Sequence, residues 1–591
     1  MKRYIGLAAS AALLSSCGGV TEAVHPNVLL ILTDDQGWGD FGFNGNEIVQ
    51  TPVLDSLSQL SAHLTNFYVS PLSASTRAGI LTGREHLRTG AMSVTRSSEN
   101  MDSREQTIAE LFKANNYSTG CFGKWHNGAH YPQDPNGQGF DEFVGFCAGH
   151  LTNYFDSRLQ HNQQFFNGEG YISDLLTDRA IDFMGESIKN DTPFFCYVPY
   201  NAPHAPYQVP DEYYDKYAHI ATSDTDMTPA VYAMCENLDF NIGRLLDYIT
   251  KSGVEDNTLI VFMTDNGPNN FRYNGVLKGR KGQSYEGGFK VPCLVYWKGR
   301  IEPIEIPNTT SYVDIMPTIL DLCGIDSSPV DGREITGVSL KGLLSGETSE
   351  LKDRYLFTHR AYSHLELESC EGVVYNDRYK LITFGGGRRE LYDKQNDPSE
   401  EHDLSIENPT LKDSLANVYD NWFANVKPEY ERSISRTAHI GILDEPIELP
   451  SHEALMSGET RYYTNIHGWA GDWLVDMSPN DAIYWDVIVD TKADYQITLQ
   501  YSSTQQPQKV SLAGGEVIDL KPYTPQRIPS PDRSPRVEAY EQRWGEQTIG
   551  VVHLDKGEQQ IRLLFDANDT IGKGSLEVKG IEIIKLDPKK L

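Results

Sequence analysis

Three continuous apolar runs constrain this chain more than any other feature of its sequence. They cover residues 28–32, 194–198 and 259–263. Runs of this length without alternation are typical of strands that are buried on both faces of a parallel sheet. Between the second and third runs, apolar residues recur at a helical spacing of three or four over 231–249. This alternation of strands and helices predicts an α/β domain with a large mixed, mostly parallel sheet flanked by helices.

The chain length and the changes of pattern predict further domains. At 591 residues, the chain is longer than one hydrophobic core normally serves. We expect the α/β domain at residues 25–330 and a small α+β subdomain that completes its fold at 331–440. Residues 433–457 show few periodic signals and are interpreted as a linker or a wrapping segment. The strand-like alternation over 458–591 predicts a β-sandwich accessory domain.

The N-terminus resembles an export signal. Lys2 and Arg3 precede an apolar stretch of about eleven residues, which fits a signal-peptide core and is too short to span a membrane. The stretch ends at Cys17 in a Leu-Ser-Ser-Cys sequence, similar to a bacterial lipoprotein cleavage box in which the cysteine is lipidated. We therefore expect a signal peptide at 1–17 and an exported lipoprotein, periplasmic or on the cell surface, held by a lipid anchor. An ordinary signal peptide with an incidental cysteine is the alternative.

The charge of the chain excludes some partners. Its 51 basic and 82 acidic residues give a net charge of -31. No nucleic acid is expected as a partner, because binding to the phosphate backbone needs a basic face. An anionic substrate is repelled at long range, so a site for one must be a local pocket of fixed positive groups. The cysteines other than Cys17 are scattered without a CxxC pair, and we expect buried free thiols.

Hard oxygen donors follow two of the predicted strands. Asp34 and Asp35 come just after the first apolar run, and Asp265 and Asn266 come just after the third. In open α/β sheets, ligands bind beyond the carboxyl ends of the strands. Carboxylate and amide oxygens suit calcium. Asp and Asn are also ordinary turn residues, so each pair alone carries little weight.

Basic and nucleophilic side chains follow other segments. Lys124 and His126 lie two positions apart on an extended segment, so that both side chains can face the same way. His204 follows the run at 194–198. Ser73 to Arg77 reads as a loop that enters a helix, and the N-terminus of a helix favours anions. A serine-rich N-cap is the structural alternative.

Together these segments resemble the sulfatase family, a branch of the alkaline-phosphatase-like superfamily. Ser73 and Arg77 fill the first and last positions of the family's five-residue motif, and Thr82-Gly83-Arg84 follows at the family spacing. The other matching motifs stand in the family order at 27–35, 123–126, 202–204, 264–267, 277–282, 286–288, 311–318 and 390–393. The similarity covers residues 26–425.

The resemblance implies a formylglycine-dependent type I sulfatase, a sulfuric ester hydrolase, in the serine-type form. Ser73 would be oxidised to formylglycine by an anaerobic sulfatase-maturing enzyme, and the gem-diol of its hydrate would attack the sulfur of a sulfated saccharide. One position departs from the motif. The third residue is Ser75, where the family has Pro or Ala, and the maturing enzyme reads this segment.

The resemblance also assigns the site residues. It implies a Ca²⁺ ion held by Asp34, Asp35, Ser73, Asp265 and Asn266, acting as Lewis acid and template. Arg77 and Lys124 would stabilise the diol, and Lys281 would contact the sulfate and the leaving oxygen. His126 would assist the diol, and His204 would be the general acid.

Two other functions remain open. A phosphatase or phosphodiesterase of the same superfamily would use unmodified Ser73 and two zinc ions, but its Asp-His ligand pair is replaced here by Asp265-Asn266. Lys124 and Lys281 also occupy places where a second metal would lie. The second alternative is a glycan-binding lipoprotein that keeps the fold without catalysis.

The sugar and the sulfate position are not readable from the sequence. Candidate pocket residues, each also explicable as structural, are His150, Asn153, Arg272, His359 and His364. The many aromatic residues after 458, among them Trp473 and Trp485, suit either sugar stacking or the core of the sandwich, and we expect the core.

Overall fold

The computed structural model describes residues 25–328, 332–362, 365–433, 437–463, 472–504, 508–536, 540–565 and 575–587. The predicted signal peptide at 1–17 lies outside these residues. Within them, no helix combines the length and the apolarity that crossing a membrane requires. The seven cysteines in the described residues are buried and free, as expected.

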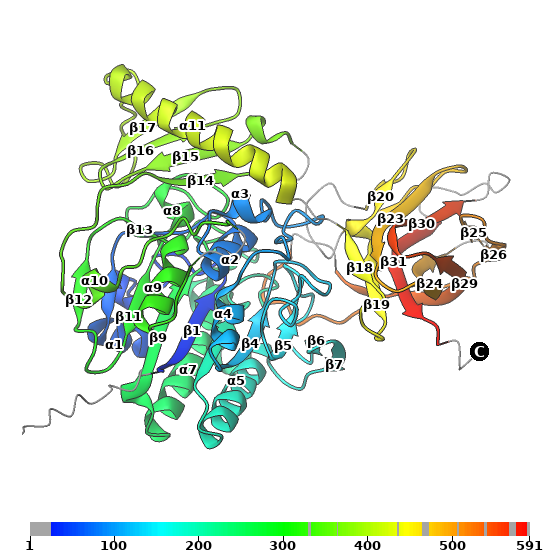
Figure 1. Ribbon diagram of the computed structural model, residues 1–591, viewed down its shortest axis with the longest axis horizontal. Helices are drawn as coiled ribbons and strands as arrows, with labels where there is room; N and C mark the ends of the chain where they lie inside the picture. Colours follow the sequence, from blue (N-terminus) through cyan, green and yellow to red (C-terminus); the bar gives the residue numbers. More distant parts are fainter. Residues whose placement is uncertain are drawn as a thin grey trace, which may run out of the picture.

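A ten-stranded sheet organises the described part of the N-terminal domain (Figure 1). Its parallel centre consists of β9 (Thr258–Thr264), β1 (Asn27–Thr33), β8 (Phe194–Pro199), β4 (Ser118–Lys124) and β5 (Glu142–Phe146). The flanking strands are β12 (Ile304–Ile306), β2 (Ala62–Leu64), β11 (Cys293–Tyr296), β6 (Arg158–His161) and β7 (Gln164–Asn167). All residues of β1, β8 and β9 are buried, which explains their uninterrupted apolar runs.

Helices cover both faces of this sheet. Leu29 and Ile31 of β1 face one core, which includes residues of α1 (Pro52–Leu60), α5 (Ile172–Lys189) and α7 (Thr228–Lys251). Leu30 and Leu32 face the other core, which includes residues of α2 (Ser73–Thr82), α4 (Ile108–Ala114) and α9 (Ile315–Leu322). The predicted α/β class with a mixed, mostly parallel sheet is confirmed.

Shorter elements complete this domain. A small sheet joins β10 (Lys290–Val291), β3 (Phe67–Tyr68) and β13 (Thr310–Ser311). The short helices are α3 (His86–Thr89), α6 (Asp211–Tyr217), α8 (Glu286–Phe289) and α10 (Lys341–Leu344).

An antiparallel sheet and a long helix form the small subdomain. The strands are β14 (Leu356–Arg360), β15 (Glu371–Tyr375), β16 (Tyr379–Thr383) and β17 (Arg389–Asp393), and α11 (Pro409–Ser433) lies across them (Figure 1). Leu87 and Met92 of the larger domain belong to the core under this helix. The subdomain is therefore packed onto the α/β domain rather than tethered to it.

Two further sheets share one hydrophobic core and form a β-sandwich at the C-terminal end. One contains β18 (Ala438–Ile440), β20 (Leu455–Met456), β23 (Ala482–Val489), β25 (Lys509–Leu512), β26 (Val517–Asp519) and β30 (Gly557–Phe565). The other contains β19 (Ile447–Pro450), β21 (Arg461–Tyr462), β22 (Leu474–Val475), β24 (Ala493–Ser503), β29 (Gly545–Leu554) and β31 (Leu576–Lys585). A ribbon of β27 (Gln526–Arg527) and β28 (Gln542–Arg543) extends from it.

The sandwich begins earlier than the sequence indicates. Strands β18, β19 and β20 lie in the segment that we interpreted as a linker or a wrapping segment, so the sandwich starts at Ala438 rather than at residue 458. Each of these strands is too short to show an alternating pattern. Trp485 is buried in the sandwich core and its indole donates to Pro450 O, as expected of a core aromatic.

Largely buried polar contacts join the sandwich to the α/β domain. His130 Nε2 lies 2.8 Å from Glu453 Oε2, and only about a tenth of each side chain is exposed. Burial alone lowers the pKa of His130, but the Glu453 carboxylate outweighs it and raises that pKa above its ordinary value. Burial alone raises the pKa of Glu453, but His130 lowers it below its ordinary value. Both shifts favour the charged pair.

This pair predicts a pH-dependent stability. The contribution of His130 is fully present below its ordinary pKa of 6.5 and is lost as the pH rises through the raised value. The contribution of Glu453 is present above its ordinary pKa of 4.5 and is lost as the pH falls. Breaking one partner of a buried pair costs about 3–5 kcal/mol. We expect H130Q to lower the Tm more at about pH 5.5 than at about pH 8.5, measured by calorimetry.

The control for this experiment is H161Q, because His161 is exposed. It should change the Tm little at either pH. An equal loss of Tm for H130Q at both pH values would contradict the charged pair.

Candidate active site

The parallel pairing of β1 with β9 brings the two acidic segments together. Thr33 lies opposite Thr264 in this register, so Asp34 and Asp35 leave the sheet beside Asp265. The backbone of Asp35 donates to Asp265 Oδ1 at 3.2 Å. Asp35 has a positive φ of 62°, which turns the chain sharply at this point. The carboxyl ends of neighbouring parallel strands thus create an acidic centre.

Three oxygen atoms in this centre have no hydrogen-bond partner among the described residues. They are Asp34 Oδ1, Asp35 Oδ2 and Asn266 Oδ1, and all are buried. A buried oxygen without a partner is costly, and carboxylate oxygens doubly so. One atom each of Asp34, Asp35 and His204 lie within 4.8 Å of one another. The oxygen atoms of this centre fit a hard divalent cation such as Ca²⁺.

The other oxygen of each carboxylate is held by a lysine. Lys124 Nζ lies 2.5 Å from Asp34 Oδ2, and Lys281 Nζ lies 2.5 Å from Asp35 Oδ1. Asn266 Nδ2 also donates to Asp35 Oδ1 at 2.8 Å, so the Asn266 oxygen is left over. Each carboxylate is fixed from one side and keeps one oxygen for a ligand.

Charges shift the pKa values of these groups in opposite directions. Burial alone raises the pKa of Asp34 and Asp35, but the neighbouring lysines and His204 lower both below the ordinary value. Burial alone lowers the pKa of Lys281, but Asp35, Asp34 and Asp265 raise it. The pKa of Lys124 is lowered, since burial outweighs the attraction of Asp34.

Ser73 is the first residue of α2 and its hydroxyl lies at the edge of the acidic centre. Ser73 Oγ donates to Asp265 Oδ2 at 2.5 Å and accepts from Arg77 Nε at 3.0 Å. Arg77 also donates to Asp265 Oδ2 at 2.9 Å and to Lys124 O at 2.8 Å. Both oxygens of Asp265 are therefore engaged, unlike those of the other predicted ligands. Gly83, with φ 66°, ends the helix ten residues later in the Thr-Gly-Arg element.

His126 faces the Ser73 hydroxyl. Its Nδ1 lies 3.3 Å from Ser73 Oγ, and its Nε2 lies 2.9 Å from the carbonyl oxygen of Val94. A carbonyl only accepts, so Nε2 carries the hydrogen and Nδ1 is unprotonated beside Ser73 Oγ, whose own hydrogen is donated to Asp265. Burial and then Lys124 lower the pKa of His126 well below its ordinary value, which keeps the ring neutral. The ring packs on Gly149, where a Cβ would lie 2.1 Å from Nε2.

His204 lies near the carboxylate oxygen of Asp35 that Lys281 does not contact, with Nε2 3.8 Å from Asp35 Oδ2. Its Nδ1 bonds Ala205 O at 2.7 Å, which leaves Nε2 to face the centre. Tyr154 OH donates to the carbonyl oxygens of His204 and Ala205 at 3.0 and 2.8 Å. Gln208 Oε1 in turn accepts from Tyr154 N at 2.7 Å.

The sandwich reaches this loop. Gln208 Nε2 donates to Ser530 Oγ and to Asp532 Oδ1, both at 2.7 Å. Arg536 donates to Thr152 O at 3.1 Å. A chain of hydrogen bonds thus runs from the C-terminal domain to the backbone around His204.

The structure brings together every residue predicted for the site. Those residues are Asp34, Asp35, Ser73, Arg77, Lys124, His126, His204, Asp265, Asn266 and Lys281. Their individual roles stay predictions. Ser75, the residue that departs from the motif, donates its hydroxyl to Ala91 O inside the protein.

Of the candidate pocket residues, two are held in structural contacts and two lie in a loop near His204. Arg272 is buried against Asp40, and His359 bonds Tyr419 and Leu367 O, so both are structural. The His150 ring lies 5.9 Å from that of His204, and Asn153 is part of the same loop. His364 lies outside the described residues.

Sequence reasoning missed several polar residues around the centre. Both amide atoms of Asn201 are buried without a hydrogen-bond partner in the described part of the chain, and so is Gln36 Oε1. Asn201 stands just before Ala202-Pro203-His204, and this position beside a predicted site residue could have indicated that Asn201 lies near the centre. Nothing in the sequence connects Gln208 or Tyr154 to the site, since their contacts are tertiary.

Comparison with known proteins identifies relatives of this arrangement. The family model described as Sulfatase matches residues 26–325, and the model described as N-sulphoglucosamine sulphohydrolase, C-terminal, matches 280–421. The chain is 30% identical to "Uncharacterized sulfatase YdeN" of Escherichia coli over 442 residues, which cover 66% of this chain and 77% of that protein. It is 29% identical to N-acetylgalactosamine-6-sulfatase of Mus musculus over 375 residues, 57% of this chain and 69% of that protein.

A solved structure has a similar fold over part of the chain. The crystal structure of Ps i-CgsB in complex with k-i-k-neocarrahexaose has a TM-score of 0.61 and 30% sequence identity. The match covers 67% of this chain and 92% of that one. Both family models end before the first strand of the sandwich, at residue 421 or earlier.

The unpartnered oxygens predict that a divalent cation stabilises the folded protein. At a Ca²⁺ concentration of about 100 times its Kd, binding should add about 2.7 kcal/mol to the free energy of unfolding. We expect the Tm to rise with Ca²⁺ and to fall with a chelator, measured by thermal unfolding.

N266A and D34N should reduce this response, because each removes a donor atom or a ligand charge. D256N, at an exposed carboxylate, should respond as the unmodified protein does. The same Tm with Ca²⁺ and with chelator would contradict the cation site.

Proposed function

The chain belongs to the sulfatase family and is a sulfuric ester hydrolase, and we propose that it removes sulfate from a sulfated carbohydrate through a formylglycine formed at Ser73. One observation carries the proposal. The Ser73 hydroxyl lies within hydrogen-bond distance of Arg77, His126 and Asp265, beside oxygens that lack partners. A buried nucleophile position next to a neutral histidine and a cation site suits covalent catalysis.

The names of relatives support a carbohydrate substrate. One relative is named N-acetylgalactosamine-6-sulfatase, and the similar crystal structure contains neocarrahexaose. Both concern sulfated sugars of different backbones, so the proposal covers sulfated carbohydrates as a class. The sugar and the sulfate position are left to a panel of position-defined sulfated saccharides.

A divalent cation completes the charge of the pocket. Three carboxylates, Asp34, Asp35 and Asp265, face three basic side chains, Arg77, Lys124 and Lys281, so the residues alone nearly cancel. Ca²⁺ bound there would add two positive charges and act as Lewis acid towards a sulfate oxygen. The local positive pocket that an acidic protein needs for an anion thus depends on the cation.

The residues around Ser73 suit the nucleophile side of the reaction. Formylglycine at this position supplies a hydrate with one hydroxyl for attack and a second for release of sulfate. His126 Nδ1 is placed to accept a proton from a group on this side chain. Arg77 and Lys124 are fixed beside it, bonded to each other through Lys124 O, and stabilise negative charge on oxygen.

Lys281 and His204 suit the leaving-group side. Both contact Asp35, one at each carboxylate oxygen, and neither has a contact with Ser73 in the described residues. A cation and a histidine at one place can neutralise the charge that develops on the leaving oxygen. We assign Lys281 to the sulfate and the leaving oxygen, and His204 to its protonation.

The competing functions are less consistent with the site. A two-zinc phosphatase needs ligand atoms for a second metal. Here Lys124 and Lys281 each occupy one oxygen of Asp34 and Asp35, which leaves donors for a single cation. A non-catalytic glycan-binding protein has no need for buried charges of this kind.

The modification of Ser73 is the first test. We expect mass spectrometry of the peptide that contains Ser73 to show the loss of two hydrogen atoms when the protein is produced with an anaerobic, serine-type sulfatase-maturing enzyme. Ser70 in the same peptide should stay unmodified. S75A restores the motif and should be converted at least as fully as the natural sequence. Unmodified Ser73 in the presence of an active maturing enzyme would overturn the proposed chemistry.

The role of His204 predicts a dependence on the leaving group. H204A should lower kcat/KM on a sugar sulfate by on the order of 10²-fold, because the alkoxide needs a proton. It should lower kcat/KM on 4-nitrophenyl sulfate much less, because nitrophenolate leaves without one. K124A, on the nucleophile side, serves as the comparison and should slow both substrates alike. Equal losses for H204A on both substrates would contradict a general acid at this position.

A further inference from the structure

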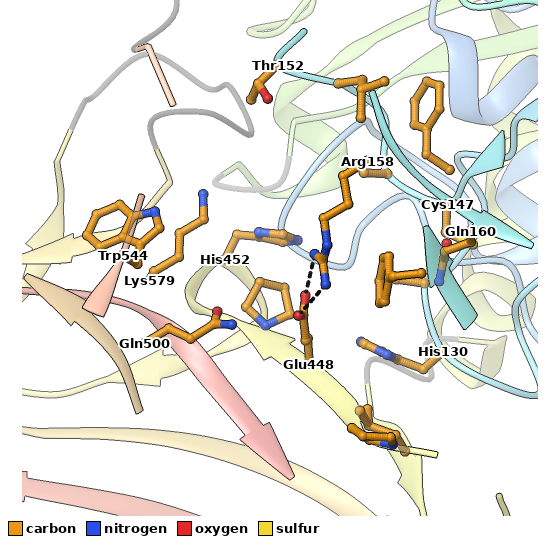
Figure 2. A pocket seen from close by; sticks show the side chains of 18 of the residues that line it. His130, Cys147, Thr152, Arg158, Gln160, Glu448, His452, Gln500, Trp544 and Lys579 are labelled. Atoms are coloured by element: carbon orange, nitrogen blue, oxygen red, sulfur yellow. Dashed lines mark hydrogen bonds and ion pairs between the residues drawn. The ribbon is translucent and has the colours of Figure 1, made fainter. Parts of the chain in front are cut away.

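A cavity of about 480 Å³ lies between the α/β domain and the sandwich (Figure 2). One wall comes from β6, β7 and the segment at 146–152, and the other from β19, β24, β31 and the segment at 541–546. Ligand pockets commonly form at domain interfaces, with volumes of about 300–1,000 Å³. The volume and the location of this cavity are therefore within the range found for ligand pockets.

The cavity adjoins the candidate active site. Cys147 and His150 line it, and the His150 ring lies against the ring of His204. Gly149, between them, is the surface on which the His126 ring packs. One short segment is therefore shared by the cavity and by both predicted catalytic histidines.

Two ion pairs join charged groups of the cavity, and the lining also includes the acidic side chains of Asp472 and Glu546. Arg158 and Glu448 form a two-bonded ion pair at 2.9 and 3.3 Å, visible in Figure 2. Lys579 lies 3.1 Å from Glu541. No excess of positive charge remains in these pairs, so the cavity differs from the site around Ser73 and does not suit a sulfate group.

Aromatic rings and free amides line the cavity on both sides. Trp544 is fixed by its bond to Glu541 Oε1 at 2.9 Å and by an edge contact with Trp473. Phe165, across the cavity, is half exposed and lies under Arg158. Rings of this kind offer flat apolar surfaces to a ligand.

The amides of Gln160 and Gln500 point into the cavity in Figure 2 from opposite domains. Neither side chain has a hydrogen-bond partner in the parts of the chain that the structure describes. Apolar surfaces with a few such polar groups match the C–H faces and the hydroxyl groups of an uncharged sugar.

We propose that this cavity binds uncharged sugar residues that flank the sulfated residue of the substrate chain. This inference rests on the proposed function, because the ligand is taken to be part of a sulfated carbohydrate substrate. It makes the sandwich a part of the substrate site, and it predicts that the enzyme distinguishes an oligosaccharide from a sulfated monosaccharide by contacts remote from Ser73.

Binding of uncharged oligosaccharides tests the proposal directly. The probes are neoagarohexaose, cellohexaose and chitohexaose, titrated by calorimetry into the full-length S73A protein, which cannot turn over sulfate. We expect at least one to bind, and W544A to weaken that binding about tenfold, the equivalent of about 1.4 kcal/mol. Y484A, at an aromatic outside the cavity lining, should bind as before.

Two further measurements distinguish loss of sugar binding from misfolding of one variant. Q500A and F165A lie on opposite walls and should also weaken binding, so the test does not depend on one variant that fails to fold. In the converted enzyme, W544A should lower kcat/KM on a sulfated oligosaccharide more than on 4-nitrophenyl sulfate, which has no flanking sugar to bind.

Failure of all three hexasaccharides to bind, or equal binding to W544A, would overturn the inference. It would leave the sulfatase proposal intact, because turnover of a small sulfate ester does not need the cavity. Conversely, an unconverted Ser73 would not affect the binding of uncharged probes.

Discussion

The register between β1 and β9 is the constraint on which the site depends. Thr33 and Thr264 lie side by side, so the residues that follow them place three carboxylates in a volume from which water is excluded. Carboxylates at such distances repel one another unless cations separate them. Lys124 and Lys281 take one oxygen each, and the remaining oxygens point to a further cation. The clustering of these carboxylates therefore explains both the cation site and the positively charged groups around it.

The sandwich contacts the segments that hold both histidines. Asp472 of the sandwich binds Thr95 and Arg96, which follow the carbonyl that fixes His126. Ser530 and Asp532 bind Gln208, which supports the loop of His204 through Tyr154. An accessory domain that only tethered the enzyme to a polymer would not need contacts at these two places. The C-terminal domain is therefore best regarded as a support of the active site as well as a wall of the cavity beside it.

Much of the fold and the site could be predicted because the burial of a strand determines which residues its local sequence contains. Strands covered on both faces become continuous apolar runs, and the polar residues after them lie at one edge by topology. Strands β18, β19 and β20 were not predicted, because strands of two to four residues are too short to show an alternating apolar pattern. The bond between Gln208 and Asp532 spans 324 positions and has no local signature. For the same reason, the sequence did not show that Asp265 has both oxygens engaged while Asp34 and Asp35 each keep one free.

The central claim is that the hydrolysis of sulfate esters depends on an oxidised Ser73. The most direct test compares preparations of one protein in which the fraction of converted Ser73 differs, obtained by varying the amount of maturing enzyme during production. Free sulfate released from a sulfated oligosaccharide is then measured in the presence of Ca²⁺. The account predicts a rate proportional to the converted fraction and extrapolating to zero for unconverted protein. A rate that is independent of this fraction would contradict it.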